Sequence, residues 1–264
     1  MPTFSVPGAE LDVELSDEGG CPVVQLHGLT SSRYRDRLLD LDLGRGLSGT
    51  RLLRYDARGH GRSTGREVPA DYRWSVLADD LLRLLDHWFP DEQVHGVGPS
   101  MGTGTLLHAA VRDPGRFRGL TLLVPPTAWE TRAAKAADYE RAAQVVESDG
   151  MAAFVEAGRA VPRPPATVDA PETVPDVTER LLPSLLRGAA LTDLPAGADV
   201  AGIDVPVTVL AWSEDPAHPV STAQALVAVL PQARLEVAHT PADVARWPQL
   251  LCEDVAAHNP RARR

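Results

Sequence analysis

The chain has 264 residues, of which 44% are hydrophobic and 23% are charged, a composition typical of a globular protein with a sizeable core. Its formal net charge of −10 argues against nucleic acid or an anionic membrane as a partner, because both favour a basic surface. The two cysteines, Cys21 and Cys252, lie far apart without metal-ligand spacing, which indicates free thiols in a reducing compartment.

No targeting or membrane segment is predicted. The N-terminal residues MPTFSVPGAELDVEL lack the basic start and the apolar stretch of a signal peptide. No apolar run approaches the roughly 20 residues that a membrane helix needs. These features predict a cytoplasmic protein with no membrane partner.

Predicted strands and helices alternate along most of the chain. Residues 3–6 and 11–15 alternate around Pro7-Gly8, which predicts an opening β-hairpin. Short apolar runs without alternation, typical of strands buried on both faces of a parallel sheet, follow at 23–26, 51–55, 93–97, 120–124, 207–211 and 235–238. Helical patterns lie at 74–89, 105–111 and 222–230. This order predicts an α/β fold with right-handed crossovers.

One long segment interrupts the alternation. Residues 126–204 contain no strand pattern but carry helical patterns over 131–147, 151–157 and 176–191, the last interrupted by Pro183. A strandless stretch of this length favours a helical cap rather than a loop. We therefore predict a core of residues 1–125 and 205–264 and a cap of residues 126–204.

The motif Gly98-Pro99-Ser100-Met101-Gly102 fits G-x-S-x-G between a predicted strand and a predicted helix. In that setting the chain turns sharply and exposes the serine oxygen. The positions two before and two after the serine then approach each other, so both need glycine. The helix that follows points its N-terminal amides toward any developing anion.

Several motifs in the same order make the chain resemble the α/β-hydrolase superfamily. VVQLHGLTSS (23–32) is similar to the strand and His-Gly oxyanion loop, and RLLRYDARGHGRST (51–64) to the turn after the next strand. VHGVGPSMGTGTLLHAA (94–110) resembles the nucleophile elbow, and VTVLAWSEDPAHPVSTAQALVAVLP (207–231) the strand and turn that carry the acid. The resemblance implies a mostly parallel twisted sheet flanked by helices, with a variable cap.

The resemblance also implies roles for particular residues. The oxyanion hole would be formed by the backbone amides of Met101 and Leu29. His27 is expected to brace its loop by hydrogen bonding rather than to react. Arg58 and His60 are expected to have structural roles in their glycine-containing turn.

A nucleophilic serine needs a base, and the base needs an acid to fix its tautomer. The chain order in this fold is Ser, then Asp or Glu, then His. Asp215 in SEDPAHP, after a predicted strand, is the first candidate for the acid. Glu214 competes with it because the turn is about one residue shorter than the family pattern, and Glu130 would serve if the acid followed the earlier strand.

The predicted base is His239, which follows the last predicted strand. Val237 and Ala238 precede it where the family commonly has glycines, so a surface histidine is the alternative interpretation. His218 is a further candidate, but it lies in the turn of the acid and we expect it to be poorly placed to reach both partners.

These residues predict a serine hydrolase that cleaves a carboxylic ester, thioester or lactone through an acyl-enzyme on Ser100, with His239 as base and Asp215 as acid. The partner would be a small-molecule acyl substrate. No cofactor or metal is implied, since there is no dinucleotide fingerprint and no metal-ligand cluster. The alternative is a non-hydrolytic protein of the same fold: a ligand-binding or receptor-like protein, or an acyl-transfer or lyase enzyme of a biosynthetic pathway.

Overall fold

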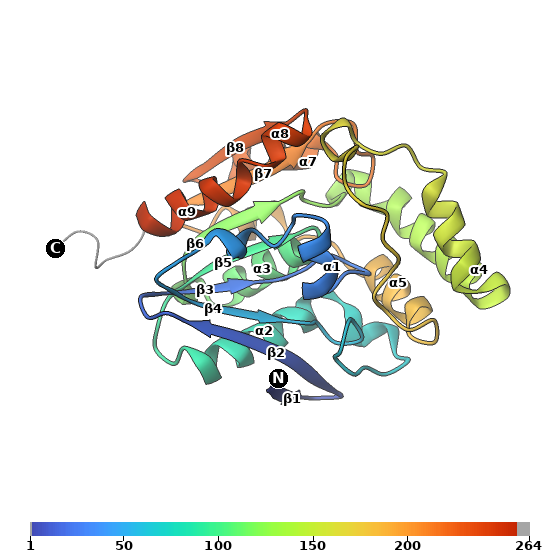
Figure 1. Cartoon of the computed structure of the whole chain (residues 1–264), viewed down its shortest axis with the longest axis horizontal. Coiled ribbons are helices and arrows are strands. Elements are labelled where there is room, and N and C mark those ends of the chain that lie inside the picture. Colours follow the sequence, from blue (N-terminus) through green and yellow to red (C-terminus); the bar gives the residue numbers. More distant parts are fainter. Residues whose placement is uncertain (1, 258–264) are drawn as a thin grey trace.

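A computed structural model of the chain describes residues 2–257 and shows one eight-stranded sheet with helices on both faces (Figure 1). Residues 1 and 258–264 of the predicted core lie outside the described residues. The strand order is β1-β2-β4-β3-β5-β6-β7-β8. The strands are β1 (Thr3–Val6), β2 (Ala9–Asp17), β3 (Cys21–Gln25), β4 (Thr50–Tyr55), β5 (Val94–Pro99), β6 (Phe117–Leu123), β7 (Val207–Trp212) and β8 (Ala233–Ala238).

The pairing of the strands agrees with the hydrophobic pattern. β1 and β2 form the predicted antiparallel hairpin, and β2 also pairs antiparallel with β4. From β4 to β8 every pairing is parallel. The inner strands β3, β5 and β7 are buried along their whole length, whereas the edge strand β8 alternates between exposed and partly buried positions. The predicted fold class, an α/β-hydrolase fold, is therefore confirmed.

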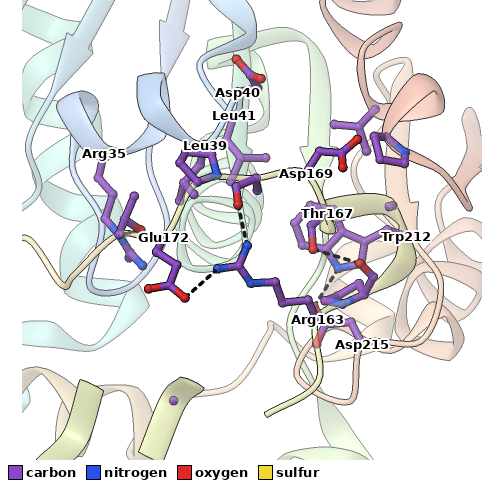
Figure 2. A pocket seen from close by; sticks show the side chains of 18 of the residues that line it. Arg35, Leu39, Asp40, Leu41, Arg163, Thr167, Asp169, Glu172, Trp212 and Asp215 are labelled. Carbon is purple, nitrogen blue, oxygen red and sulfur yellow. Dashed lines mark hydrogen bonds and ion pairs between the residues drawn. The ribbon is translucent and has the colours of Figure 1, made fainter. Parts of the chain in front are cut away.

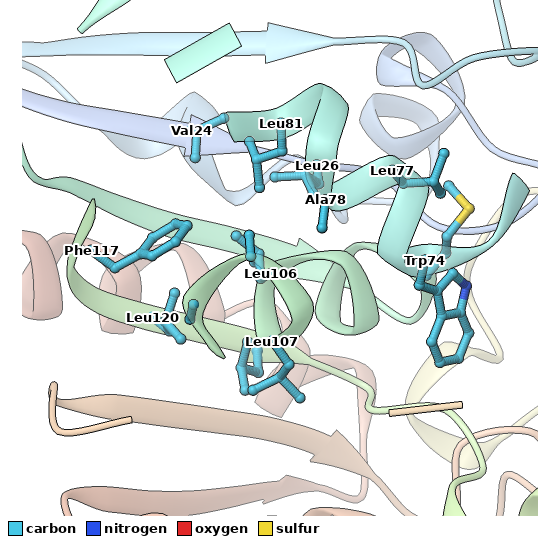
Figure 3. Close-up of a cluster of buried hydrophobic side chains, with 14 of the residues drawn as sticks. Val24, Leu26, Trp74, Leu77, Ala78, Leu81, Leu106, Leu107, Phe117 and Leu120 are labelled. Atoms are coloured by element: carbon cyan, nitrogen blue, oxygen red, sulfur yellow. The ribbon is translucent and has the colours of Figure 1, made fainter. Parts of the chain in front are cut away.

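The core lies on both faces of the sheet. On one face α2 (Trp74–Trp88), α3 (Met101–Arg112) and α7 (Val220–Val229) bury an apolar cluster, part of which is drawn in Figure 3. On the other face α9 (Trp247–Ala257) covers a second cluster that contains Val23, Val97 and Leu210. The short helices α1 (Arg33–Leu38), α6 (Gly197–Val200) and α8 (Pro241–Val244) complete the layers.

The segment between β6 and β7 is built from helices and loops, with no strand among its residues. Its main elements are α4 (Arg132–Arg159) and α5 (Leu182–Ala190), which lie beside one end of the sheet in Figure 1. α4 is broken at Gly150, whose φ of 81° is non-helical, so the two predicted helical pieces are joined by a kink. Pro183 lies in the first turn of α5, where a missing amide costs nothing.

The division of the chain into a core and a cap stays a prediction. It assigns residues 1–125 and 205–264 to the core and residues 126–204 to the cap. Among residues 2–257 no helix is both long and apolar enough to cross a membrane.

Candidate active site

Ser100 lies at the junction of β5 and α3, between the last strand residue, Pro99, and the first helical residue, Met101. Its backbone has φ 51° and ψ −107°, a conformation that residues other than glycine rarely adopt. The Ser100 amide donates to the carbonyl of Leu123 on β6, and the Ser100 carbonyl accepts from the amide of Gly104. These bonds on both sides hold the strained turn that the motif predicts.

The two motif glycines are required by close packing at this turn. A Cβ on Gly98 would lie 3.0 Å from the Cβ of Leu26 and 3.3 Å from the Cα of Gly102. A Cβ on Gly102 would lie 3.0 Å from the same Leu26 atom and 3.2 Å from the carbonyl oxygen of His27. The expectation that these positions approach each other is met, and Leu26, the residue directly after β3, adds a second constraint.

The His27-Gly28 loop lies against the serine. A Cβ on Gly28 would lie 3.9 Å from the Cβ of Ser100. The His27 ring braces this loop: its Nδ1–H donates to the carbonyl of Gly28 at 2.8 Å, and its Nε2 accepts from the amide of Ala57 at 2.9 Å. Burial lowers the pKa of His27, which keeps the ring in this neutral form. The ring therefore holds the loop in position beside the serine.

Two backbone amides beside the serine are free to bind a ligand. Among residues 2–257, the amides of Leu29 and Met101 have no hydrogen-bond partner. Met101 is the first residue of α3, so its amide belongs to the positive end of a helix of 12 residues. Leu29 follows Gly28, where an added Cβ would lie 3.9 Å from the Cβ of Ser100. The two residues predicted to form an oxyanion hole thus have backbone amides without a hydrogen-bond partner in the described part of the chain; their role stays a prediction.

The acid turn follows β7. Asp215 accepts hydrogen bonds from the indole Nε1–H of Trp212 at 2.7 Å and from the amide of Ala217 at 2.8 Å. Burial would raise the pKa of Asp215, but the hydrogen bond and electrostatic attraction of the His218 ring, together with the hydrogen bond from the Trp212 indole, outweigh it and hold that pKa well below its usual range. Asp215 is therefore an ionised acceptor.

The alternative acids point elsewhere. Glu214 is exposed and has a positive φ of 61°, which turns the chain toward Asp215. Glu130 is also exposed, within the short 3-10 turn Trp129–Thr131 that precedes α4. Of the three candidate acids, the structure brings Asp215 to the serine site.

The histidine in contact with Ser100 is His218. Its Nε2 lies 2.9 Å from Ser100 Oγ, and its Nδ1 lies 2.7 Å from Asp215 Oδ2. With Nδ1–H donating to the carboxylate, Nε2 is free to accept the serine proton. The His218 side chain is 22% exposed and that of Asp215 is 12% exposed, so the pair is shielded but reachable.

The prediction that His239 contacts the serine is not met. His239 is exposed at the end of β8, where its Nδ1 lies 3.1 Å from Ser213 Oγ and its amide donates to Asp243. Asp243 and Thr240 form a capping box that starts α8, so the chain after β8 turns into a helix instead of reaching across to β5. The surface-histidine interpretation describes His239 better.

The expectation that His218 is poorly placed also fails, because the turn folds back on itself. The His218 amide donates to the carbonyl of Asp215 at 3.2 Å, and Pro216 and Pro219 restrict the backbone on either side. Residues three apart in such a turn bring their side chains together. The two prolines of Asp-Pro-Ala-His-Pro indicate a turn in the sequence, but they do not indicate that its first and fourth side chains meet.

Arg58 and His60 lie in the structural surroundings of the site. Arg58 makes a bidentate ion pair with buried Asp80 on α2. Its Nε and Nη2 each donate to one carboxylate oxygen at 2.7 Å. His60 donates from Nδ1 to the Arg58 carbonyl and packs its ring 5.0 Å from that of His27. Burial lowers the pKa of His60 to about 3, so the ring is neutral. Both side chains hold their own turn in place beside the His27-Gly28 loop.

Residues of the segment between β6 and β7, together with residues before β4 and after β7, line an open cavity of about 590 Å³ that includes Asp215. Asp215 and Trp212 line one part of it, and Arg163 and Arg35 line others (Figure 2); Thr30 and Phe154 also belong to its lining. Ser100 and His218 do not line the cavity, which therefore reaches the site from the side of the acid. Nearer the serine, apolar residues of α4 and α5 pack against Leu29.

Comparison with known proteins agrees with this geometry. A sequence model described as the alpha/beta hydrolase fold matches residues 22–243. The chain belongs to the alpha/beta hydrolase fold family. It is 30% identical over 195 residues to 3-oxoadipate enol-lactonase 2 of Acinetobacter baylyi, covering 70% of this chain and 69% of that protein.

Solved structures of this alpha/beta hydrolase family share the fold. A thermophilic esterase from Thermogutta terrifontis superposes with a TM-score of 0.75 at 22% identity, covering 97% of both chains. The enol-lactonase from Burkholderia xenovorans LB400 gives a TM-score of 0.75 at 22% identity, covering 97% of this chain and 99% of that one. The expectation of an α/β-hydrolase enzyme acting on ester bonds is confirmed at the level of the family.

Proposed function

We propose that the protein is a serine hydrolase that cleaves a carboxylic ester, thioester or lactone through an acyl-enzyme on Ser100. The observation that carries the proposal is the continuous hydrogen-bonded chain from Asp215 through His218 to Ser100, with distances of 2.7 and 2.9 Å. These are the three roles that nucleophilic catalysis by serine needs, and the chain order Ser, Asp, His fits this fold.

In the first half of the reaction, Ser100 Oγ attacks the carbonyl carbon while His218 Nε2 takes the serine proton. The Asp215 carboxylate holds the Nδ1–H and stabilises the imidazolium that forms. The tetrahedral intermediate collapses as the bond to the leaving alcohol or thiol breaks, and His218 gives its proton to that group. Water then attacks the acyl-enzyme with His218 as base, releasing the acid and restoring Ser100.

The amides of Leu29 and Met101 are the proposed donors to the oxyanion. Both lack partners within residues 2–257, and the Met101 amide, directly after Ser100 in the chain, gains from the dipole of α3. Donors fixed in place before the reaction stabilise the developing charge without reorganisation.

The substrate is a small molecule that reaches the site through the cavity under the cap. A volume of about 590 Å³ lies within the usual range for such sites. Because the relative with 30% identity is named an enol-lactonase, lactones belong in the substrate panel beside open-chain esters.

The test is to incubate the wild-type protein and Ser100→Ala with short p-nitrophenyl esters and with a fluorophosphonate probe. We expect ester turnover and probe labelling at Ser100 in the wild type, and loss of both in the variant. Neither turnover nor labelling in the folded wild-type protein would refute the proposal. Products other than the free acid, formed in the presence of an added acceptor alcohol, would instead favour acyl transfer.

A further inference from the structure

The cavity contains one arginine that is not neutralised. Four arginines line it, and three of them meet carboxylates or lie near one: Arg45 pairs with Asp40, and Arg159 and Arg163 both approach Glu172. Arg35, in α1, has no carboxylate within ion-pair distance among residues 2–257. Figure 2 shows Arg35 on the wall formed by the core, facing the cap segment that carries Arg163 and Glu172.

Neutral groups hold the Arg35 guanidinium in place. Its Nε–H donates to Thr173 Oγ1 of the cap at 2.9 Å, and its Nη1 donates to the carbonyl and hydroxyl oxygens of Thr30 at 3.2 and 3.3 Å. Among the described residues Nη2 has no partner. One nitrogen of a partly buried, fixed cation is thus available to a ligand in the cavity.

The electrostatic surroundings leave this cation undersatisfied. Burial lowers the pKa of Arg35, and only the more distant charges of Asp36 and Asp176 oppose that effect. Burial also raises the pKa of Asp36 to about 7, so this carboxyl is partly protonated near neutral pH. Asp176 is engaged by the hydroxyl of Ser32 at 2.5 Å. An anionic ligand would supply the missing charge.

The cation also lies near the reacting centre. Arg35 contacts Thr30, which directly follows Leu29, the proposed oxyanion donor. Two residues of extended chain span at most ~7 Å, so the guanidinium lies within roughly 11 Å of the Leu29 amide. A carboxylate separated from the scissile carbonyl by a few carbon atoms could therefore reach Arg35 while the carbonyl occupies the oxyanion site.

We propose that Arg35 binds an anionic group of the substrate, and that the preferred substrate is an ester or lactone carrying a carboxylate a few carbons from the scissile bond. The inference rests on the proposed hydrolase function. The free Nη2 can donate a charge-assisted hydrogen bond to a carboxylate, and such a bond is stronger where water is partly excluded. Arg35 is then a specificity-determining residue and takes no part in proton transfer.

The experiment compares mono-p-nitrophenyl adipate with p-nitrophenyl hexanoate, which has the same chain length without the charge. We expect the wild type to have the higher kcat/KM for the adipate ester. Arg35→Gln should raise KM for that ester about 10- to 100-fold, as expected for loss of a charged hydrogen bond, with little change for the hexanoate. Arg35→Lys should keep part of the preference.

A second arm asks on which side of the ester the anion lies, comparing 4-acetoxybutyrate with butyl acetate by acid release. Arg141→Gln, an equal charge change on the exposed face of α4, is the control and should leave both preferences intact. The inference is overturned if neither arm shows a preference for the carboxylate, or if Arg35→Gln lowers anionic and neutral turnover equally. Failure of the wild type on every ester, without labelling of Ser100, would instead refute the hydrolase function.

Discussion

Asp215 and His218 are only three residues apart in one turn, yet the Nδ1 of the histidine lies 2.7 Å from the carboxylate while its other nitrogen lies 2.9 Å from Ser100 Oγ. A single turn after β7 therefore carries two of the three groups that the proposed chemistry needs. The turn is fixed by the Trp212 indole and the Ala217 amide, which both donate to Asp215.

Mutation of each candidate histidine, His218 and His239, shows which one acts as the base. We expect His218→Ala to lower kcat for a p-nitrophenyl ester by roughly 10³-fold or more, because Ser100 loses its base. His239→Ala should change kcat less than about twofold, because its contacts are with Ser213 and Asp243 at the surface. Steady-state kinetics of both variants, with circular dichroism to confirm folding, provide the measurement. The reverse order of effects would return the role of base to His239.

The Trp212 indole is expected to position the acid. Trp212→Phe removes the 2.7 Å hydrogen bond to Asp215 and keeps an aromatic ring against Trp247. Loss of one hydrogen bond to a charged group predicts a fall in kcat of roughly 10-fold, with KM nearly constant. Trp247→Phe, which alters the same stack without touching the acid, serves as the control. An equal fall in kcat in both variants would assign the effect to packing.

The glycine before the serine should be intolerant of a methyl group. Gly98→Ala places a Cβ 3.0 Å from Leu26, and the resulting overpacking predicts a loss of about 1–3 kcal/mol in the free energy of unfolding. Gly158→Ala in α4 meets nothing within 4 Å and should instead stabilise the protein by about 0.5–1 kcal/mol. Denaturant unfolding of both variants tests the pair; a neutral Gly98→Ala would contradict the tight turn.

Asp36 predicts a pH dependence of stability. Burial raises its pKa from 3.8 to about 7, so the folded protein binds one more proton than the unfolded chain between about pH 4 and pH 7. Stability contributed by this group is therefore present at low pH and falls as the pH rises through that range. In Asp36→Asn the side chain no longer titrates. We expect the free energy of unfolding of the variant, minus that of the wild type, to increase from pH 4 to pH 7, as measured by urea denaturation. A difference independent of pH would contradict the prediction.

Much of the fold could be predicted because burial leaves a clear trace in the sequence. Strands such as β3 and β7 are buried on both faces and read as unbroken apolar runs. The serine turn could be predicted because its glycines are imposed by contact with Leu26 and with each other. Helix α1, by contrast, is short, and its sequence RYRDRL carries no apolar stripe, so no hydrophobic pattern predicts it.

The base could not be predicted because its position depends on turn geometry. Whether residues three apart meet depends on the backbone angles between them, and the deciding bond from the His218 amide to the Asp215 carbonyl has no sequence pattern of its own. The free Nη2 of Arg35 could not be predicted either, because its neighbours Thr30 and Thr173 are 143 positions apart in the sequence and meet only in the folded chain.

The placement of His218 changes how the site is assembled. With acid and base on one short turn, the relay depends on a single alignment, between the tip of β7 and the elbow after β5. Nothing beyond residue 218 contributes a reacting group in the proposed mechanism. The C-terminal strand and helices then act on the site through packing: Trp247 of α9 stacks on Trp212, whose indole donates to Asp215, so these elements support the alignment without supplying a proton donor or acceptor.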